Sequence, residues 1–453
     1  MEQVREFMIN VVDKSVQRLI QNNLKIESFS LTMPIADPNL IWLVDRWMEL
    51  VLNYGAREIV LSVSTHPHTS KTHYILPQTI FRVKSLSTSS KFCSLQKLYL
   101  SKVYISENII QDIIRNCPNI TDFHLWNFLG LKAVRISNLD KLEYLSVGVL
   151  ECNRELETVH IDAVKLQGFR TYMPNLPAYG ISFTSFCNLK QLSLNKCQIT
   201  DDILHLHLSK FPLLERLQIF NCHMLRRVRI FAQRLRCLRL GGFTMAEVIE
   251  IDCPTLSSFV YSASSTPVLI SKNVPFAMDI EHRPPRCELI SSWFLELRED
   301  LRFSYQSKNF ALKFVKLAQV SFDLEELGDV QIPPLSEVDD LEITWTAMIE
   351  SLVCEPLMDG LLWCCHPRTI SLPSNVYQYN CIKLLCEKLL GTKTPTCCNS
   401  TRIRCWRHDF KGAKIEILGE VEGEWPHGWN HLVDPLPALA KDRGVRFQLE
   451  WDY

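Results

Sequence analysis

The sequence predicts an α/β solenoid, a chain of stacked structural repeats with a parallel sheet along one side. Two observations carry this prediction. The chain has 453 residues, more than one ordinary compact core holds unless the chain is repetitive. An apolar phrase also recurs at nearly even spacing through its middle. Hydrophobic residues make up 47% and charged residues 22% of the chain, as in ordinary soluble proteins, so spacing rather than composition predicts the fold.

The repeated phrase has the form L-x-x-L-x-L, with other apolar residues allowed at the marked places. Its eight clear copies begin at Leu95, Ile120, Leu142, Leu166, Leu189, Leu214, Leu235 and Leu256. Successive copies are separated by 25, 22, 24, 23, 25, 21 and 21 positions. Leucine-rich repeats have periods of about 20–29 residues, so the phrase predicts a leucine-rich-repeat solenoid. Each phrase is a short strand, and the residues between its apolar positions face the concave side of the sheet.

The segments between these strands predict two kinds of return path on the convex side. Ser106 and Thr200 each precede an apolar helical pattern as N-caps. Elsewhere a weaker apolar phrase takes the place of the helix and predicts a short return strand. These weaker phrases are Leu131/Val134/Ile136, Leu156/Val159/Ile161 and Leu225/Val228/Ile230. Cys197 and Cys222 follow their strands at the same position, where a small side chain turns inward.

The ends of the chain predict caps for the solenoid core. Apolar spacing predicts helices over 7–20 and 40–53, the second ending at Gly55 as a C′ glycine. We assign residues 1–90 to capping helices and first repeats, 91–345 to leucine-rich repeats, and 346–453 to an α+β cap domain. In that last domain the pattern predicts helices near 357–364 and 377–390. It predicts strands over 369–372, 402–405, 413–418 and 445–451.

The order of these parts resembles the plant F-box/leucine-rich-repeat proteins of the FBD type. The resemblance rests on the helical opening, the Val44-Asp45-Arg46-Trp47 block, the repeats with Cys197 and Cys222, and the tail. In the tail, residues 365–372 (CHPRTISL) and 403–410 (IRCWRHDF) look like the FBD domain that closes many family members. The resemblance implies the substrate-recognition part of an SCF-type ubiquitin ligase receptor. The alternative is a free-standing leucine-rich-repeat interaction protein with no ligase role.

The family's F-box docks on a Skp1-type adaptor. Residues 1–25 are too few to hold this module, so we expect the chain to lack it and to bind that adaptor only if an F-box stands upstream. The expected partner is an unknown protein bound on the concave surface.

Partner-binding residues are expected on the concave face of the strands, where aromatic and arginine side chains suit a binding hot spot. These candidates are Asp122, His124, Trp126, Tyr144, Arg170, Tyr172, Gln191, Arg216, Gln218 and Arg239.

Arginines also cluster at Arg226, Arg227, Arg229, Arg234, Arg236 and Arg239, with Arg216 just before. One interpretation is an anion site, since guanidinium groups suit carboxylates and phosphates. The other is solvated charge divided between two surfaces, because Arg227 and Arg229 fall on a return strand.

Seventeen cysteines indicate reduced, mostly buried thiols, because the N-terminus shows no secretion signal. The C-terminal cysteines raise a zinc hypothesis, but only Cys381 and Cys386 have ligand-pair spacing and no second pair mirrors them. We therefore expect no metal and no cofactor. His66, His68 and His73 form a polar loop cluster, and no catalytic motif surrounds them, so we expect no enzyme.

The net charge of −1 gives no indication of nucleic-acid binding, and no apolar run is long enough for a membrane span. We expect a cytoplasmic or nuclear protein.

Overall fold

The computed structural model describes most of the chain. The described residues are 6–22, 24–34, 40–64, 73–82, 92–149, 155–183, 186–262, 268–273, 279–282, 288–303, 309–314, 317–327, 331–347, 350–375, 377, 379–390, 403–418 and 444–452. The chain forms two compact units, Met1–Leu225 and Arg226–Tyr453. Their boundary lies inside the segment predicted to be repeats. It falls within the repeat that begins at Leu214, between its inner strand and the return strand that follows.

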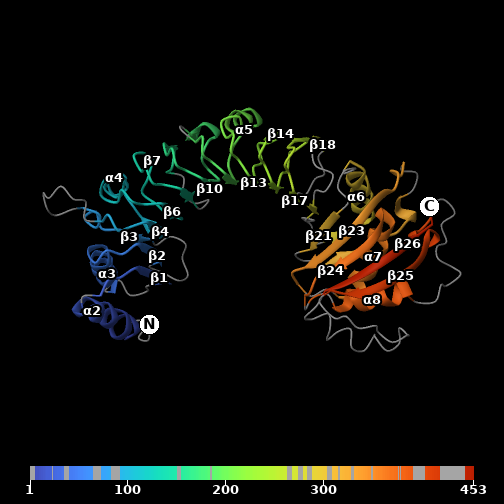
Figure 1. Ribbon diagram of the computed structural model, residues 1–453, viewed down its shortest axis with the longest axis horizontal. Helices are drawn as coiled ribbons and strands as arrows, with labels where there is room; N and C mark the ends of the chain where they lie inside the picture. Colours follow the sequence, from blue (N-terminus) through green and yellow to red (C-terminus); the bar gives the residue numbers. More distant parts are fainter. Residues whose placement is uncertain are drawn as a thin grey trace. The chain divides into compact units, whose positions relative to one another are not determined.

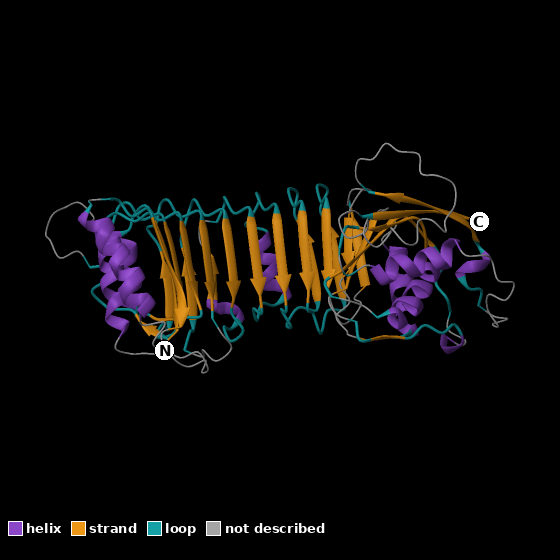
Figure 2. Cartoon of the chain, turned by 90° about the horizontal axis from the view of Figure 1, so that it is seen from below, coloured by secondary structure: helices purple, strands orange, loops and turns teal. Residues whose placement is uncertain are grey.

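The first unit is built on a parallel sheet whose strands follow one another in chain order (Figure 2). Its strands are β1 (Ser28–Pro34), β2 (Glu58–Ser64), β4 (Lys97–Ser101), β6 (Asp122–Trp126), β8 (Tyr144–Gly148), β10 (Gly168–Tyr172), β12 (Gln191–Asn195) and β13 (Arg216–Phe220). The apolar residues of the repeated phrase are buried, as Leu192 and Leu194 in β12 illustrate. The predicted strands and their parallel order are therefore confirmed.

Helices and short strands form the outer side of this unit (Figure 1). The helices are α3 (Ile41–Asn53), α4 (Glu107–Asn116) and α5 (Asp201–Leu208). The predicted return strands are β7 (Ala133–Ile136) and β9 (Thr158–Ile161), which pair in parallel with each other and with β11 (Ile181–Phe183). A two-stranded sheet joins β3 (Tyr74–Ile75) to β5 (Val103–Tyr104). We call the opposite side of the main sheet, away from these elements, the inner face.

The turn after each of two strands reverses the chain tightly. Lys196 and Asn221 have positive φ angles of 52° and 55°. The buried Cys197 and Cys222 follow them and donate their thiols to the carbonyls of Asn195 and Phe220, each at 3.5 Å. The inward turn predicted for these cysteines is confirmed, and each thiol adds a hydrogen bond to a carbonyl that already accepts a backbone N–H.

The predicted caps occupy their positions, but only one acts as expected. Gly55 follows α3 with a φ of +80°, as a C′ glycine does. Ser106 and Thr200 precede α4 and α5 with extended backbones, yet neither side chain makes a capping hydrogen bond. The start of each helix is thus set by backbone geometry and burial of its apolar side.

The first helical segment consists of a π-helical stretch, Met8–Asp13, that continues as α2 (Lys14–Gln21). Asp13 is buried and accepts hydrogen bonds from Trp47 Nε1 at 2.9 Å and Gln17 Nε2 at 2.5 Å. Arg46 lies 3.6 Å from the same carboxylate. This single acid therefore joins the N-terminal helix to α3 and closes that end of the core.

The second unit continues the same architecture and then changes it. Its main sheet has the strands β15 (Cys237–Gly241), β17 (Ser258–Ser262), β19 (Asp279–His282), β21 (Asn309–Phe314), β23 (Ser336–Trp345), β24 (Cys365–Leu372), β26 (Val445–Trp451) and β25 (Phe410–Ile417), in that order. Pairing is parallel from β15 to β24, whereas β26 runs antiparallel to both β24 and β25. This antiparallel end corresponds to the predicted change from leucine-rich repeats to an α+β cap domain near the C-terminus.

Smaller elements complete this unit. An outer sheet contains β14 (Arg227–Phe231), β16 (Val248–Asp252) and β18 (Val268–Lys272), and β20 (Glu288–Leu289) pairs with β22 (Gln319–Val320). The helices are α6 (Ser291–Phe303), α7 (Ser351–Cys364) and α8 (Tyr379–Leu390). The described elements of this unit that were not predicted include β16, β18, β19, β20 and α6.

The strand predicted over 402–405 is wrong. Residues 403–405 form no strand and lead into the 3₁₀ helix Trp406–His408. The buried side chains here are Ile403 and Trp406. They lie three residues apart, which suits a turn rather than the two-residue alternation of a strand.

Among the described helices, none is both long and apolar enough to cross a membrane.

Candidate partner-binding face

The inner face of the first unit presents three rows of side chains across the strands from β6 to β13, because these strands pair in parallel with matching registers. Row one is Asp122, Tyr144, Gly168, Gln191 and Arg216. Row two is His124, Ser146, Arg170, Ser193 and Gln218. Row three is Trp126, Gly148, Tyr172, Asn195 and Phe220. Residues distant in sequence thus become immediate neighbours.

A cavity of about 440 Å³ opens in this face. The residues that line it on the inner face come from all five strands: His124, Trp126, Tyr144, Ser146, Gly168, Arg170, Gln191, Ser193, Arg216 and Gln218. The hollow follows from the rows. Gly168, Ser146 and Ser193 lie between larger side chains of neighbouring strands, so the floor is low where they align and the rim is high.

Two aromatic side chains form one wall, each over a glycine. A Cβ added at Gly148 would lie 2.3 Å from Cε3 of Trp126, and one at Gly168 would lie 2.7 Å from Cδ1 of Tyr144. The Trp126 indole also donates from Nε1 to the buried Ser146 Oγ at 2.7 Å. Glycine allows these rings to lie against the sheet, and the hydrogen bond fixes the indole.

His124 stacks on Tyr99 of the neighbouring strand, with ring centroids 4.2 Å apart and an interplanar angle of 9°. Burial lowers the pKa of His124; Asp122 opposes the shift and the positive charge of Arg170 adds to it. The imidazole is therefore neutral near pH 7. Among the described residues it has no hydrogen bond to Ser146 or Asp122, so these three side chains form no proton relay.

Arg170 and Arg216 form the opposite wall. Both are exposed and lie on β10 and β13, with Gln191 and Ser193 of β12 between the two strands. Within the part of the chain that the structure describes, no carboxylate forms an ion pair with either guanidinium. The wall is therefore positively charged and open to a ligand.

The predicted partner-binding residues divide into three groups by position. Seven line the cavity: His124, Trp126, Tyr144, Arg170, Gln191, Arg216 and Gln218. Asp122 and Tyr172 lie on the same rows outside it, and Lys196 stands 5.6 Å from the Tyr172 ring centroid. Arg239 lies exposed on β15 of the second unit. Gly148 and Gly168 were not predicted as part of the site; the available signal is a glycine inside a strand phrase, which marks close approach by another group.

Two of the arginines that cluster in the sequence between Arg226 and Arg239 have a different environment. Arg227 and Arg229 lie on the outer strand β14, where they approach Glu247 at 3.9 Å and Glu250 at 3.6 Å. Lys272 also binds Glu250, at 2.6 Å. These arginines thus face carboxylates of their own outer sheet, which agrees with the interpretation of solvated charge on a separate surface.

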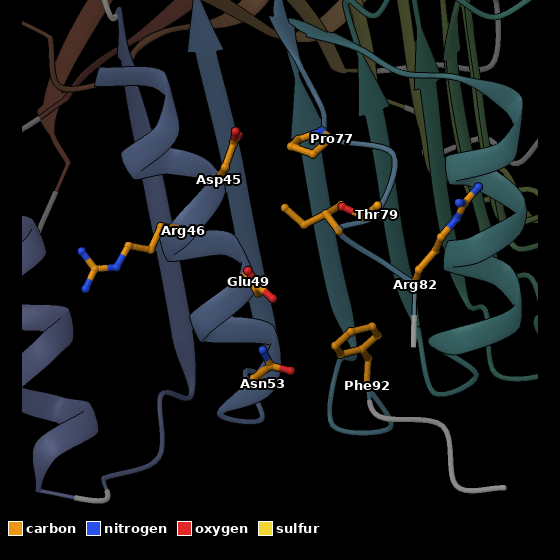
Figure 3. Close-up of a pocket in the computed structure, with 9 residues that line it drawn as sticks. Asp45, Arg46, Glu49, Asn53, Pro77, Thr79, Arg82 and Phe92 are labelled. Carbon is orange, nitrogen blue, oxygen red and sulfur yellow. The ribbon is translucent and has the colours of Figure 1, made fainter. Parts of the chain in front are cut away.

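A second cavity, of about 330 Å³, lies between α3 and residues 77–82 (Figure 3). Its charged side chains are already bonded within the chain. Asp45 accepts a hydrogen bond from Tyr74, and Arg82 donates to Asp112 at 3.0 Å. Figure 3 shows Arg46 directed away from Arg82, and Arg46 approaches Asp13 at 3.6 Å. This lining therefore stabilises the N-terminal end of the unit, and we do not assign it a ligand.

The pair of cysteines with ligand-like spacing does not face one direction. Cys381 and Cys386 both lie on α8, where a separation of five residues turns the side chains about 140° apart. Burial raises the pKa of the Cys386 thiol to about 12. Among the described residues, no group of cysteine, histidine and acidic side chains has the arrangement of a metal site. Cys397 and Cys398, like His66 and His68, lie outside the described residues. His73 contacts Asn127 at 3.2 Å.

Comparison with known protein families now adds a direct match. Residues 177–281 match the family described as At1g61320/AtMIF1, LRR domain. The chain is a leucine-rich-repeat protein in fold. The matched segment includes β12 and β13, and so contributes the cavity residues from Gln191 to Gln218. The comparison with curated proteins finds no match.

Proposed function

We propose that this chain is a protein-binding scaffold and that the inner face of its first unit is the surface that binds the partner. The observation that carries the proposal is the 440 Å³ cavity lined by aromatic, amide and arginine side chains from five neighbouring strands. Tryptophan, tyrosine and arginine are the residues most enriched at interface hot spots. Regular strands hold them in fixed relative positions, which reduces the entropy lost on binding.

Binding rather than catalysis is the activity that we propose. Ser146 accepts a hydrogen bond from Trp126, and His124 stacks on Tyr99, so neither side chain is placed as a nucleophile or its base. The remaining polar lining consists of long arginine and glutamine side chains, which suit recognition. Hydrolase or kinase activity in the purified chain would contradict this part of the proposal.

The binding function is testable without knowledge of the natural partner. Peptides are selected from a random display library on the immobilised full chain, and their affinities are measured by fluorescence anisotropy. Ser193→Trp fills the cavity from its centre. Ser182→Trp places the same bulk on the outer strand β11, where Ser182 is exposed, and serves as the control. We expect Ser193→Trp to weaken binding by at least roughly tenfold, the loss typical of one hot-spot contact, with Ser182→Trp unchanged.

Failure to select any peptide that discriminates these two variants would overturn the proposed binding face.

The finer role, substrate recognition for an SCF-type ubiquitin ligase, is supported by the resemblance of the helical opening, the repeats and the tail to F-box/leucine-rich-repeat proteins. The alternative is a free-standing interaction scaffold. Binding of the 453-residue chain to a purified Skp1-type adaptor, measured by pull-down with an F-box protein as positive control, separates the two. Binding would support direct ligase assembly, and its absence would exclude direct assembly by this chain, since the adaptor is expected to bind only if an F-box stands upstream.

A further inference from the structure

The charges of the inner face indicate which ligand chemistry it selects. On β8, β10, β12 and β13, the charged residues among the three rows are Arg170 and Arg216, and the described rows contain no carboxylate on these strands. The first acid in the rows is Asp122, on β6, four strands from Arg216. On four of the five cavity strands, the rows therefore carry two positive charges and no carboxylate.

Some exposed arginines of this chain do have carboxylate partners. Arg82 bonds Asp112 at 3.0 Å, and Arg229 lies 3.6 Å from Glu250. Within the described residues Arg170 and Arg216 have no such partner, and both line the cavity, whereas Arg135 and Arg239 are exposed elsewhere. An open guanidinium pair beside a cavity fits the planar oxygens of a carboxylate or phosphate.

A small residue lies on the strand between the two arginines. Ser193 of β12 neighbours Arg170 across the β10–β12 pair, whereas Gly168, two residues before Arg170, is covered by the Tyr144 ring. Gln191 neighbours Arg216 and supplies an amide donor beside it. Arg170, Gln191 and Arg216 all line the cavity, which therefore offers an anion two guanidinium groups and one amide.

We propose, building on the binding function proposed above, that the cavity takes an anionic side chain of an extended peptide, held between Arg170 and Arg216. The aromatic wall of Trp126 and Tyr144 contacts an apolar residue of the same peptide. Tyr144 and Arg216 share row one and lie three strand spacings apart, about 14 Å. An extended peptide rises roughly 3.3 Å per residue, so the apolar and acidic residues should stand about four positions apart.

The test uses two pools of synthetic seven-residue peptides. Both have tryptophan or tyrosine at position two and random neutral residues elsewhere; one has glutamate and the other glutamine at position six. The protein is the full chain, either wild type or with Arg170→Gln and Arg216→Gln. The control variant carries Lys132→Gln and Arg135→Gln, which remove two exposed charges from the outer side beside β7.

We expect the glutamate pool to bind the wild type roughly tenfold more tightly than the glutamine pool, as two partly exposed charge-assisted contacts allow. The Arg170/Arg216 variant should lose that difference, and the Lys132/Arg135 variant should keep it. Equal binding of the two pools, or equal loss in both variants, would overturn the anion site. If peptides still discriminate Ser193→Trp from Ser182→Trp in that case, the binding face stands and only its charge preference fails.

A third pool with phosphoserine at position six separates the two sources of the anion. Tighter binding than the glutamate pool identifies a phosphorylated partner, and weaker binding identifies an acidic one. His124 supplies a readout that does not depend on affinity. Asp122 and Arg170 are the charged groups that act on its imidazole, beside the ring of Tyr99. An anion that neutralises Arg170 should raise the pKa of His124 in an NMR titration, and an unchanged pKa at saturating peptide would contradict binding at Arg170.

Discussion

The indole of Trp126 lies flat against Gly148 of the neighbouring strand, so close that a Cβ at position 148 would stand 2.3 Å from Cε3. The same indole donates to Ser146 Oγ at 2.7 Å. The glycine and the serine, both on β8, therefore fix the orientation of one wall of the cavity. The wall depends on Gly148 having no side chain.

Gly148→Ala should displace the Trp126 ring and break its hydrogen bond to Ser146. The expected cost is about 1–2 kcal/mol of unfolding free energy, from the lost bond and the overpacked contact. The near-ultraviolet circular dichroism of the indole should change with it. Gly412→Ala in β25 is the matched control, because a Cβ there meets nothing within 4 Å. Equal stability of the two variants in chemical denaturation would contradict the packing role of Gly148.

The strands were predictable because their signal is local. In each phrase the buried positions alternate at a spacing that the sequence displays, and even Thr171, a polar residue at an apolar place, is fully buried in β10. The return strand 158–161 was found for the same reason. The strand expected at 402–405 failed because the buried side chains, Ile403 and Trp406, lie three residues apart, which does not fit the two-residue alternation of a strand.

The cavity was not predictable from any single repeat. Its depth depends on Gly168 of one repeat standing beside Tyr144 of the repeat before and Gln191 of the repeat after. That alignment is set by the register of three strands. Because the repeats vary in length from 21 to 25 residues, it cannot be deduced from one repeat alone. The alternation of side chains along a strand predicts that Arg170 and Arg216 lie on one face of the sheet. It does not predict that no acidic side chain lies beside them. Ion pairing depends on which loops and strands come near.

Asp13→Ala should destabilise the N-terminal end of the first unit. Asp13 is buried and accepts the Trp47 indole bond at 2.9 Å, so its removal leaves a buried donor without an acceptor. The expected cost is about 2–3 kcal/mol, the usual range for a lost hydrogen bond to a charged group. Lys14→Ala, at the exposed neighbouring position, should change stability by less than about 0.5 kcal/mol. Hydrogen exchange of the helix 41–53 is the local measurement; unchanged protection in Asp13→Ala would disprove the connecting role.

Acid should destabilise the second unit through His366. The imidazole stacks on Trp451 with centroids 4.0 Å apart, and burial lowers its pKa to about 4, with Asp409 opposing the shift and Arg298 adding to it. The unfolded chain binds this proton near pH 6.5, so between pH 6.5 and about 4 it holds more protons than the folded chain. The stabilising effect is therefore complete above pH 6.5 and is lost progressively as the pH falls to 4.

His366→Phe keeps a ring against Trp451 but cannot bind the proton. Its unfolding free energy should fall less than that of the wild type between pH 7 and pH 4, by a difference on the order of 2–3 kcal/mol. Denaturant titrations at several pH values measure this difference directly. Parallel pH profiles for the two proteins would show that protonation of His366 does not drive the loss.

Thiol reactivity should separate the cysteines by burial. Among the thirteen cysteines that the structure describes, nine are buried, whereas Cys93 and Cys187 are exposed. Burial raises the pKa of the Cys253 thiol to about 11 and that of Cys365 to about 12. The thiolate is the reactive form, so both should be alkylated at pH 7.5 at least roughly a hundredfold more slowly than Cys187. Peptide mapping by mass spectrometry after timed alkylation measures each site.

The same reaction in denaturant is the internal control, because unfolding removes the burial that raises these pKa values. Cys253 and Cys365 should then react at the rate of Cys187. Fast alkylation of Cys253 in the native protein would show that the turn after β16 opens readily, since the Cys253 thiol is buried there and approaches the Ile230 carbonyl at 3.6 Å. Slow alkylation in both conditions would instead indicate an oxidised thiol, and would contradict the reduced state expected from the sequence.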